Sequence, residues 1–292
     1  MANIKSKQTK TGDTVIAAVI LIIILLCLFP MLNIFARSAS DPMAIVNRRV
    51  SFLPVDPTLD SYRFVFADPS FSRSLLWTAF LTAACTVFSL VMTVLCAYPL
   101  TYEGLKGKKV INGVIIMTMY FSAGTIPNYI LIKNLGLLNN PMVLILPGCI
   151  SVFNMIILRS FFYSVPISLR ESAELDGANP FRVLVNVYLP LSAPVMATLA
   201  LFYAVGRWNG FSDALLYLTE STFHPIQLKL YNIINNLSSI EIAAQEGASA
   251  APAASDGMKA AAVMFATVPI LVVYPWLQRY FIAGVSVGAV KE

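Results

Sequence analysis

The feature that most constrains this chain is a series of long apolar stretches, each close to the length needed to cross a lipid bilayer. A bilayer-spanning helix needs about 20 mostly apolar residues. Of the 292 residues, 58% are hydrophobic and only 12% are charged, whereas soluble globular domains carry about 25% charged residues. The sequence therefore predicts an all-α integral membrane protein with six transmembrane helices, at roughly Thr14–Ala36, Leu75–Leu100, Val110–Ile132, Met142–Phe162, Leu191–Leu216 and Ala260–Gly284.

Glycines and prolines interrupt several of these stretches. Gly124 and Pro127 fall in the third, and Pro269 and Pro275 fall in the sixth. Such residues are tolerated inside a membrane span where neighbouring helices or a cavity satisfy the freed backbone groups. The first stretch is too long for a signal peptide and has no small-residue cleavage site, so we expect it to be retained.

The positive charges favour one orientation only weakly. Lysines and arginines are divided almost equally between the two sides of a six-span topology. The short basic turn Gly104–Lys109 favours cytoplasmic N and C termini, because cytoplasmic loops are enriched in Lys and Arg. This topology leaves residues 217–259 as a long extracytoplasmic loop. We expect a short helix at Pro225–Leu237 there, followed by a tract of small residues that is either a flexible linker or ordered by a partner.

The ionisable and metal-binding residues exclude several functional classes. The four cysteines lie singly in apolar runs, and His224 is the only histidine; this pattern argues against zinc sites, disulfide frameworks and histidine-based catalysis. No aromatic and basic pattern indicates nucleic acid binding. The turn Gly104–Lys109 lacks the spacing and the Ser/Thr of a phosphate-binding loop, so we expect a chain that is not itself an enzyme and binds no cofactor.

The segment 166–194, between the fourth and fifth stretches, carries clear helix signals. Ser168 and Glu171 have the spacing of a capping box, which predicts a helix beginning at Leu169. Gly177 suits the left-handed position that ends such a helix. Asn179 followed by Pro180 predicts the start of a second helix, which Pro190 and Pro194 would end. The pattern indicates two short helices outside the bilayer, attached to it at both ends.

The same segment resembles a known family. Glu171-Ser-Ala-x-x-Asp-Gly-Ala178, Phe181 and Leu189-Pro-Leu-x-x-Pro194 resemble the EAA loop of binding-protein-dependent ABC permeases, with Ser172 in place of the usual Ala. The segment from Gly124 to Leu138 and the ending from Gln278 to Lys291 look like those of carbohydrate-uptake permeases. As a whole, the chain is similar to the six-helix permease subunit of the maltose-importer type, in its oligosaccharide-uptake branch.

This resemblance implies a type I ABC importer permease fold, built as a single transmembrane domain over residues 1–292 of a bacterial cytoplasmic membrane protein. The EAA loop would face the cytosol and dock on a separate ATPase through a coupling helix. The partners implied are a second homologous permease, two ATP-binding subunits that hold ATP and Mg²⁺, and an extracytoplasmic sugar-binding protein. The residues expected to couple to the ATPase are Glu171, Ser172, Ala173, Asp176, Gly177, Ala178 and Pro190.

Polar side chains within the spans are candidates for the substrate pathway, because such groups are costly in a membrane. In the fifth stretch, aromatic rings could stack on sugar rings, and Arg207 could favour an acidic sugar or could instead pair with Asp213 or a partner subunit. Trp208 could equally be an interfacial anchor, and all of these residues could serve in helix packing. The candidates are Tyr203, Arg207, Trp208, Asn209, Asn128 and Tyr129.

Three other functions compete with carbohydrate import by an ABC permease. An ABC permease for another small solute would share the EAA loop. An ion-coupled secondary transporter would place ionisable groups or paired broken helices near the middle of the membrane, and intramembrane acids are nearly absent from this sequence. A membrane-embedded hydrolase would need a zinc motif or a serine or aspartate pair within the spans, and the sequence contains neither.

Overall fold

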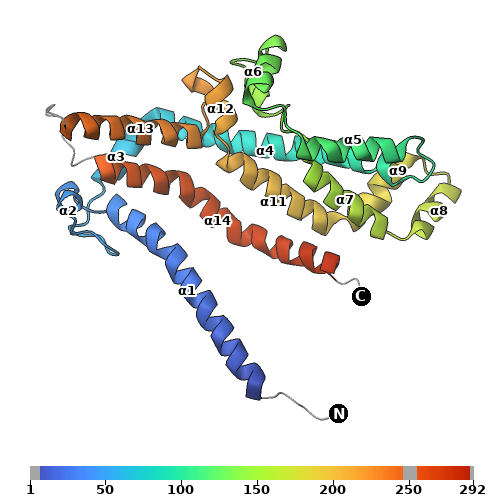
Figure 1. The fold of residues 1–292 in the computed structure, drawn as a ribbon, viewed down its shortest axis with the longest axis horizontal. Coiled ribbons are helices and arrows are strands. Elements are labelled where there is room, and N and C mark those ends of the chain that lie inside the picture. Colours follow the sequence, from blue (N-terminus) through green and yellow to red (C-terminus); the bar gives the residue numbers. More distant parts are fainter. Residues whose placement is uncertain (1–6, 246–254, 290–292) are drawn as a thin grey trace. The chain divides into compact units, whose positions relative to one another are not determined.

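The structure is a computed structural model, and it describes residues 7–245 and 255–289 of the chain. Helices and turns make up this part of the chain, which contains no strand. Figure 1 shows the order of the elements. They are α1 (Lys7–Ser38), α2 (Pro42–Val46), α3 (Asp60–Ala67), α4 (Pro69–Ala97), η1 (Pro99–Thr101), α5 (Lys108–Tyr120), α6 (Thr125–Asn134), η2 (Pro141–Leu144), α7 (Val152–Ser164), α8 (Ile167–Leu175), α9 (Pro180–Val183), η3 (Leu184–Tyr188), α10 (Leu189–Leu191), α11 (Ala193–Asn209), α12 (Ser212–Tyr217), η4 (Ser221–Phe223), α13 (Ile226–Gln245) and α14 (Ser255–Ala289).

The apolar stretches form membrane-length helices in two different ways. Within the described residues, three helices are long and apolar enough to cross a membrane alone, and six spans result if each bent helix pair counts as one. The bent pairs are α5 with α6 at 115°, α7 with α8 at 73°, and the segment Pro180–Leu191 with α11 at 82°. The predicted all-helical, six-span architecture is therefore confirmed, while the continuity of the third, fourth and fifth spans is not.

Glycine or proline residues lie where the chain interrupts the third, fourth and fifth predicted spans. Gly124 has φ 89° and ψ 173°, a conformation that is essentially restricted to glycine, and it separates α5 from α6. In the predicted span Met142–Phe162, most of the 3-10 turn η2 and most of α7 are helical, while residues 145–151 between them are irregular. Pro147 and Gly148 lie in this irregular stretch, where both residues disfavour a helix. The predicted span Leu191–Leu216 is divided at Gly210, which is extended between α11 and α12.

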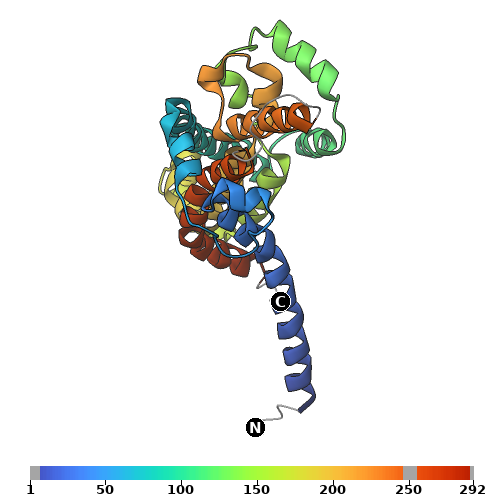
Figure 2. The ribbon, with the colours of Figure 1, turned by 90° about the vertical axis from the view of Figure 1, so that its left-hand side faces the viewer.

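The chain divides into two compact units. The first contains Met1–Phe71 and Leu230–Val268, and the second contains Ser72–Lys229 and Pro269–Glu292. In the first unit α1 projects beyond α2 and α3 (Figure 2), and no part of its apolar window is buried within this chain. Lipid or a partner must cover this surface, because so much apolar area cannot stay in water. The predicted helix at Pro225–Leu237 corresponds to α13, and most of the small-residue tract lies outside the described residues.

Close packing of small residues holds the first unit together. Gly257 lies near the start of α14, and a Cβ atom added there would come within 2.7 Å of Ser61 Oγ on α3 and 3.2 Å of Ile45 Cδ1 on α2. Ala261 and Ala266 on the same helix are fully buried. Arg37 at the end of α1 pairs with Asp256 at 3.4 Å. The small side chains at the start of α14 therefore allow three helices to approach closely.

The second unit contains two apolar clusters that position its functional segments. The larger cluster joins the end of α4 to α7, η3 and α11 through Tyr98, Phe162, Tyr188 and Leu199. The smaller cluster joins the middle of α4 to η2, the end of α12 and the first turn of α13 through Leu81, Leu144, Leu218 and Leu228. Within this unit α8 and α9 lie at one end, and α6 and α12 lie toward the other (Figure 1).

The close approach at Gly257 predicts a specific loss of stability. A Gly257→Val substitution should lower the free energy of unfolding by about 1–3 kcal/mol, because its side chain overpacks the contact with α3. Gly113→Val on α5, where a Cβ meets nothing within 4 Å, is the matched control. Thermal unfolding of the purified proteins in the same detergent would measure both, and equal midpoints for the two variants would contradict the prediction.

Candidate functional site

The segment between α7 and α11 folds into the two short helices that the sequence indicates. Val165 and Pro166 are extended, and α8 begins at Ile167 rather than at Leu169. The predicted capping box is wrong: the structure shows no side-chain cap at this end, and Ser168 lies inside the first turn. Pro166 sets the start of the helix instead, because its ring fixes φ and its carbonyl oxygen accepts a hydrogen bond from Leu169 N at 3.2 Å.

The end of α8 is a Schellman motif. Gly177 has φ 83°, its N–H donates to Glu174 O at 3.0 Å, and Ala178 N–H donates to Ala173 O at 2.9 Å. These two bonds satisfy carbonyl groups that a helix end leaves free, and the glycine takes the left-handed position at little cost. The predicted role of Gly177 in ending the helix is confirmed. Ala173 and Ala178 pack against the larger apolar cluster.

The second short helix begins where the sequence predicts but does not end where the sequence predicts. Asn179 caps α9 as predicted, because its Oδ1 accepts from Arg182 N at 2.8 Å with Pro180 at the first helical position. The helix does not stop at Pro190. It continues through the π-helical turn η3 to Leu191, and the chain bends at Ser192 before α11 begins. Pro190 lies in the last turn and is exposed.

The surface of α8 that faces away from the cluster combines charged and apolar groups. Glu171, Ser172, Asp176 and Gly177 are exposed, and the Leu175 side chain next to them is 89% exposed. The structure places six of the seven predicted coupling residues on α8 and the turn after it, with Ala173 and Ala178 on the packed side, whereas Pro190 lies apart from them on α10 (Leu189–Leu191).

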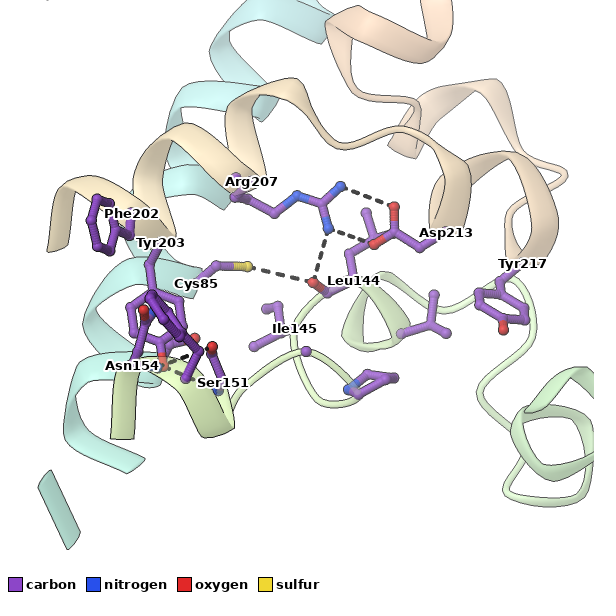
Figure 3. A pocket seen from close by; sticks show the side chains of 16 residues that line it. Cys85, Leu144, Ile145, Ser151, Asn154, Phe202, Tyr203, Arg207, Asp213 and Tyr217 are labelled. Atoms are coloured by element: carbon purple, nitrogen blue, oxygen red, sulfur yellow. Dashed lines mark hydrogen bonds and ion pairs between the residues drawn. The ribbon is translucent and has the colours of Figure 1, made fainter. Parts of the chain in front are cut away.

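A second candidate site is a cavity of about 730 Å³ within the second unit. Irregular residues 145–151 form one wall, and α4, α7 and α11 supply the others. Irregular backbone at membrane depth is found where it lines a cavity or is buried in protein. Figure 3 shows Tyr203, Ser151 and Asn154 gathered on one side of the cavity, with Arg207 and Asp213 facing one another on the other.

Protein groups hold the Arg207 guanidinium in place. Its Nη1 donates to Asp213 Oδ2 at 2.5 Å and to Leu144 O at 3.3 Å, and its Nη2 donates to Asp213 Oδ1 at 3.0 Å and to Gly210 O at 2.9 Å. The Arg207 side chain is only 10% exposed. This two-bond pairing with a carboxylate is the strong geometry for arginine. Of the possibilities that the sequence left open for Arg207, the structure shows the pairing with Asp213.

Hydroxyl groups dominate the opposite side of the cavity. Tyr203 OH lies 2.7 Å from Thr93 Oγ1 and accepts a hydrogen bond from Ser151 N at 3.1 Å. The second bond connects α11 to the start of α7, where the irregular wall ends. Asn154, on the first turn of α7, is 5% exposed and lines the same cavity. These neutral groups can exchange hydrogen bonds with a ligand rich in hydroxyls.

The six predicted pathway residues are only partly brought together. Tyr203 and Arg207 line the cavity. Tyr129 on α6 stacks on Tyr217, a lining residue, with ring centroids 6.0 Å apart. Trp208 is half-buried and Asn209 and Asn128 are exposed, and these three residues lie outside the cavity. Tyr217 and Ser89 also line the cavity and were not predicted: Tyr217 lies on α12, after the break at Gly210, and Ser89 is a small polar residue inside the apolar helix α4.

The pairing of Arg207 predicts what removal of its partner would cost. Asp213→Ala should lower stability by about 3–5 kcal/mol, because it leaves a largely buried charge uncompensated. The double variant Arg207→Met with Asp213→Leu should recover most of this loss. Thermal unfolding of the three proteins in detergent measures both effects. A single variant as stable as the parent protein would show that the pair does not hold the cavity wall.

The sequence of this chain is similar to those of known transport proteins. Residues 65–287 match the family described as "Binding-protein-dependent transport system inner membrane component". The chain is 37% identical over 284 residues to the polygalacturonan/rhamnogalacturonan transport system permease protein YtcP of Bacillus subtilis, covering 97% of this chain and 99% of the relative. It is 40% identical over 264 residues to Protein LplC of the same organism, covering 90% and 89%.

Two solved structures of bacterial ABC transporters are also similar to this chain. A crystal structure of a bacterial ABC transporter involved in the import of the acidic polysaccharide alginate superposes with a TM-score of 0.85 at 33% identity. That match covers 96% of this chain and 100% of the other. A structure of a bacterial alginate ABC transporter in complex with its pentasaccharide-bound periplasmic protein matches the fold at a TM-score of 0.61, covering 93% and 94%.

Proposed function

The chain belongs to the family of binding-protein-dependent transport system inner membrane components, and from this premise we propose that it is the permease subunit of an ATP-driven importer of acidic oligosaccharides. The observation that carries the proposal is the match over residues 65–287, which includes both the 166–194 loop and the cavity. The hypothesis of an ion-coupled secondary transporter is not retained, because the family is one of binding-protein-dependent systems.

We propose that α8 is a coupling helix that docks on a separate ATP-hydrolysing subunit on the cytosolic side. Its exposed Leu175 would enter an apolar groove of that partner, while Glu171 and Asp176 would pair with basic groups. The Schellman turn at Gly177 presents this face and fixes the exit of the chain toward α9. Closure of two such subunits around ATP and Mg²⁺ would displace α8 as a rigid body, with the N and C termini on the same side.

Relatives support the substrate class. One is by its name a permease for polygalacturonan and rhamnogalacturonan, and a structural neighbour imports alginate. The size of the cavity falls in the range of small-ligand sites, roughly 300–1,000 Å³. Tyr203 and Asn154 offer hydrogen bonds to sugar hydroxyls, and Tyr217 lines the same cavity. A second homologous permease would complete the pathway, and an extracytoplasmic binding protein would deliver the sugar.

We assign Arg207 to the shape of the cavity rather than to the sugar carboxylate. Its four Nη hydrogens are directed to Asp213, Leu144 O and Gly210 O, so a uronate would have to displace a carboxylate that already holds two of them. Selection for an acidic cargo then rests on other groups of the assembled transporter, including the delivering protein.

The coupling proposal predicts the effect of two substitutions in the loop. Gly177→Pro and Glu171→Lys should each abolish ATP-dependent uptake, because the first removes the left-handed turn and the second reverses a charge on the docking face. Membrane insertion should be unchanged, since neither side chain is buried. Gly104→Pro in the basic turn is the control for a glycine outside the loop. Normal uptake by the Gly177 and Glu171 variants would contradict the proposal.

The cavity proposal predicts that Arg207→Ala lowers uptake of acidic and of neutral oligosaccharides by similar factors, because it loosens a wall shared by both. The measurement is uptake into liposomes that contain the complete transporter, with oligogalacturonides and their methyl esters as matched substrates. A selective loss of the acidic substrate would instead show direct pairing between Arg207 and the sugar carboxylate.

A further inference from the structure

The segment that directly follows α4, residues 98–102, makes two contacts with the 166–194 loop, one with each of its short helices. Tyr98 OH donates a hydrogen bond to Pro180 O, at the start of α9, over 3.0 Å. The Arg170 guanidinium, on α8, lies over the Tyr102 ring with 4.8 Å between its carbon and the ring centroid. The left-handed Gly177 lies between these two contacts in the sequence. The two tyrosines therefore bridge the turn that joins α8 to α9.

The two contacts are connected to one another by a hydroxyl pair. Tyr98 OH and Tyr102 OH lie 2.7 Å apart. A phenol has a single hydroxyl hydrogen, and that of Tyr98 is committed to Pro180 O, so Tyr102 must donate to Tyr98. The result is a directed chain from Tyr102 through Tyr98 to Pro180 O. Hydrogen bonds in such chains polarise and strengthen one another.

Packing prevents Tyr98 from moving independently of its surroundings. Its side chain is 5% exposed, and its ring meets Phe162 of α7 and Tyr188 of η3 edge-on, at centroid distances of 6.2 Å and 5.2 Å. Phe162 and Tyr188 also contact each other, at 5.4 Å. Because protein interiors are close-packed, a displacement of α9 at Pro180 must move Tyr98 and, with it, the end of α4.

The turn that follows α4 is fastened as well. Tyr163 OH, at the end of α7, donates to Leu100 O at 2.9 Å. Lys108 Nζ donates to Thr101 O at 3.3 Å and to Tyr102 O at 3.1 Å, and it lies 5.3 Å from the centroid of the Tyr163 ring. The segment carrying Tyr102 is thus held by α5 and α7 and cannot follow Arg170 as a loose loop.

The geometry points to Tyr98 and Tyr102 as positioning residues for coupling: we propose that they fix the angle between α8 and α9 and pass the displacement of α8 to α4. The loop is joined by the chain itself only to α7 and α11. The tyrosine contacts add α4, which also lines the cavity through Cys85 and Ser89. This role rests on the proposed function of α8, and it concerns how motion reaches the cavity rather than whether α8 docks.

The test removes single hydroxyl groups while keeping the rings. Tyr98→Phe in the complete transporter, reconstituted in liposomes with its binding protein and an oligogalacturonide, should lower the sugar transported per ATP hydrolysed by roughly three- to tenfold, the factor expected from the loss of one hydrogen bond. The ATP hydrolysis rate should stay within about twofold of the parent, because α8 keeps its docking face.

A double variant tests whether the two hydroxyl groups act in one chain, because their effects on transport should then not add. The double variant Tyr98→Phe with Tyr102→Phe should be no worse than Tyr98→Phe alone, since the Tyr102 hydroxyl acts through that of Tyr98. Tyr120→Phe on α5 is the matched control, because this ring is 76% exposed and belongs to neither contact. It should keep the parent ratio of transport to hydrolysis.

Two outcomes would overturn the inference. One is an unchanged ratio of sugar transported to ATP hydrolysed in Tyr98→Phe; if both rates fall in equal proportion and the unfolding temperature is lower, the residue has a purely structural role. Independent, additive losses in the two single variants would also exclude the directed chain. If Gly177→Pro also transports normally, the proposed function fails with it; if Gly177→Pro is inactive, only the tyrosine role is lost.

Discussion

Hydrogen bonding of the backbone inside a membrane is the constraint on which the rest of this molecule depends. A free N–H or C=O group in hydrocarbon costs several kcal/mol, so irregular chain is confined to protein-lined or water-lined places. The second unit contains irregular chain at residues 145–151, and directly before it, at the end of η2, Leu144 O accepts from Arg207 and Cys85. The ion pair with Asp213 holds the Arg207 guanidinium in the position from which it donates to Leu144 O. The break in this span is tolerated because side chains from neighbouring helices, Arg207 and Cys85, donate hydrogen bonds to the free backbone carbonyl.

The loop and the cavity are connected by the same helices. Phe162 near the end of α7 belongs to the aromatic cluster against the loop, while Asn154, two turns earlier on the same helix, lines the cavity. α11 likewise begins at the bend after Leu191 and carries Tyr203 and Arg207 into the cavity wall roughly 15–20 Å further on, at 1.5 Å per residue. Short, rigid helices are suited to transmit a displacement between two such places.

Sequence reasoning recovers those features that depend on a few neighbouring residues. Gly177 and the Asn179–Pro180 pair act locally, and both form the turn and the cap expected of them. The capping box at Ser168 fails because Pro166, two residues earlier, already fixes the start of the helix. The division of the spans could not be predicted, because whether Gly124 or Pro147 breaks a helix depends on partners that arrive from distant parts of the chain. The hydrogen bond from Arg159 on α7 to Asn112 on α5 could not be predicted either, because it joins residues that are far apart in the sequence.

Arg207 and Cys85 donate hydrogen bonds to one main-chain carbonyl, Leu144 O, beside the wall formed by residues 145–151. Main-chain groups are the same for every residue type, so replacing these residues one at a time with alanine would leave Leu144 O and its neighbours in position. Adding or deleting a residue would shift all of them together. In this part of the molecule the spacing of the chain, as well as the identity of its side chains, sets the shape offered to a ligand.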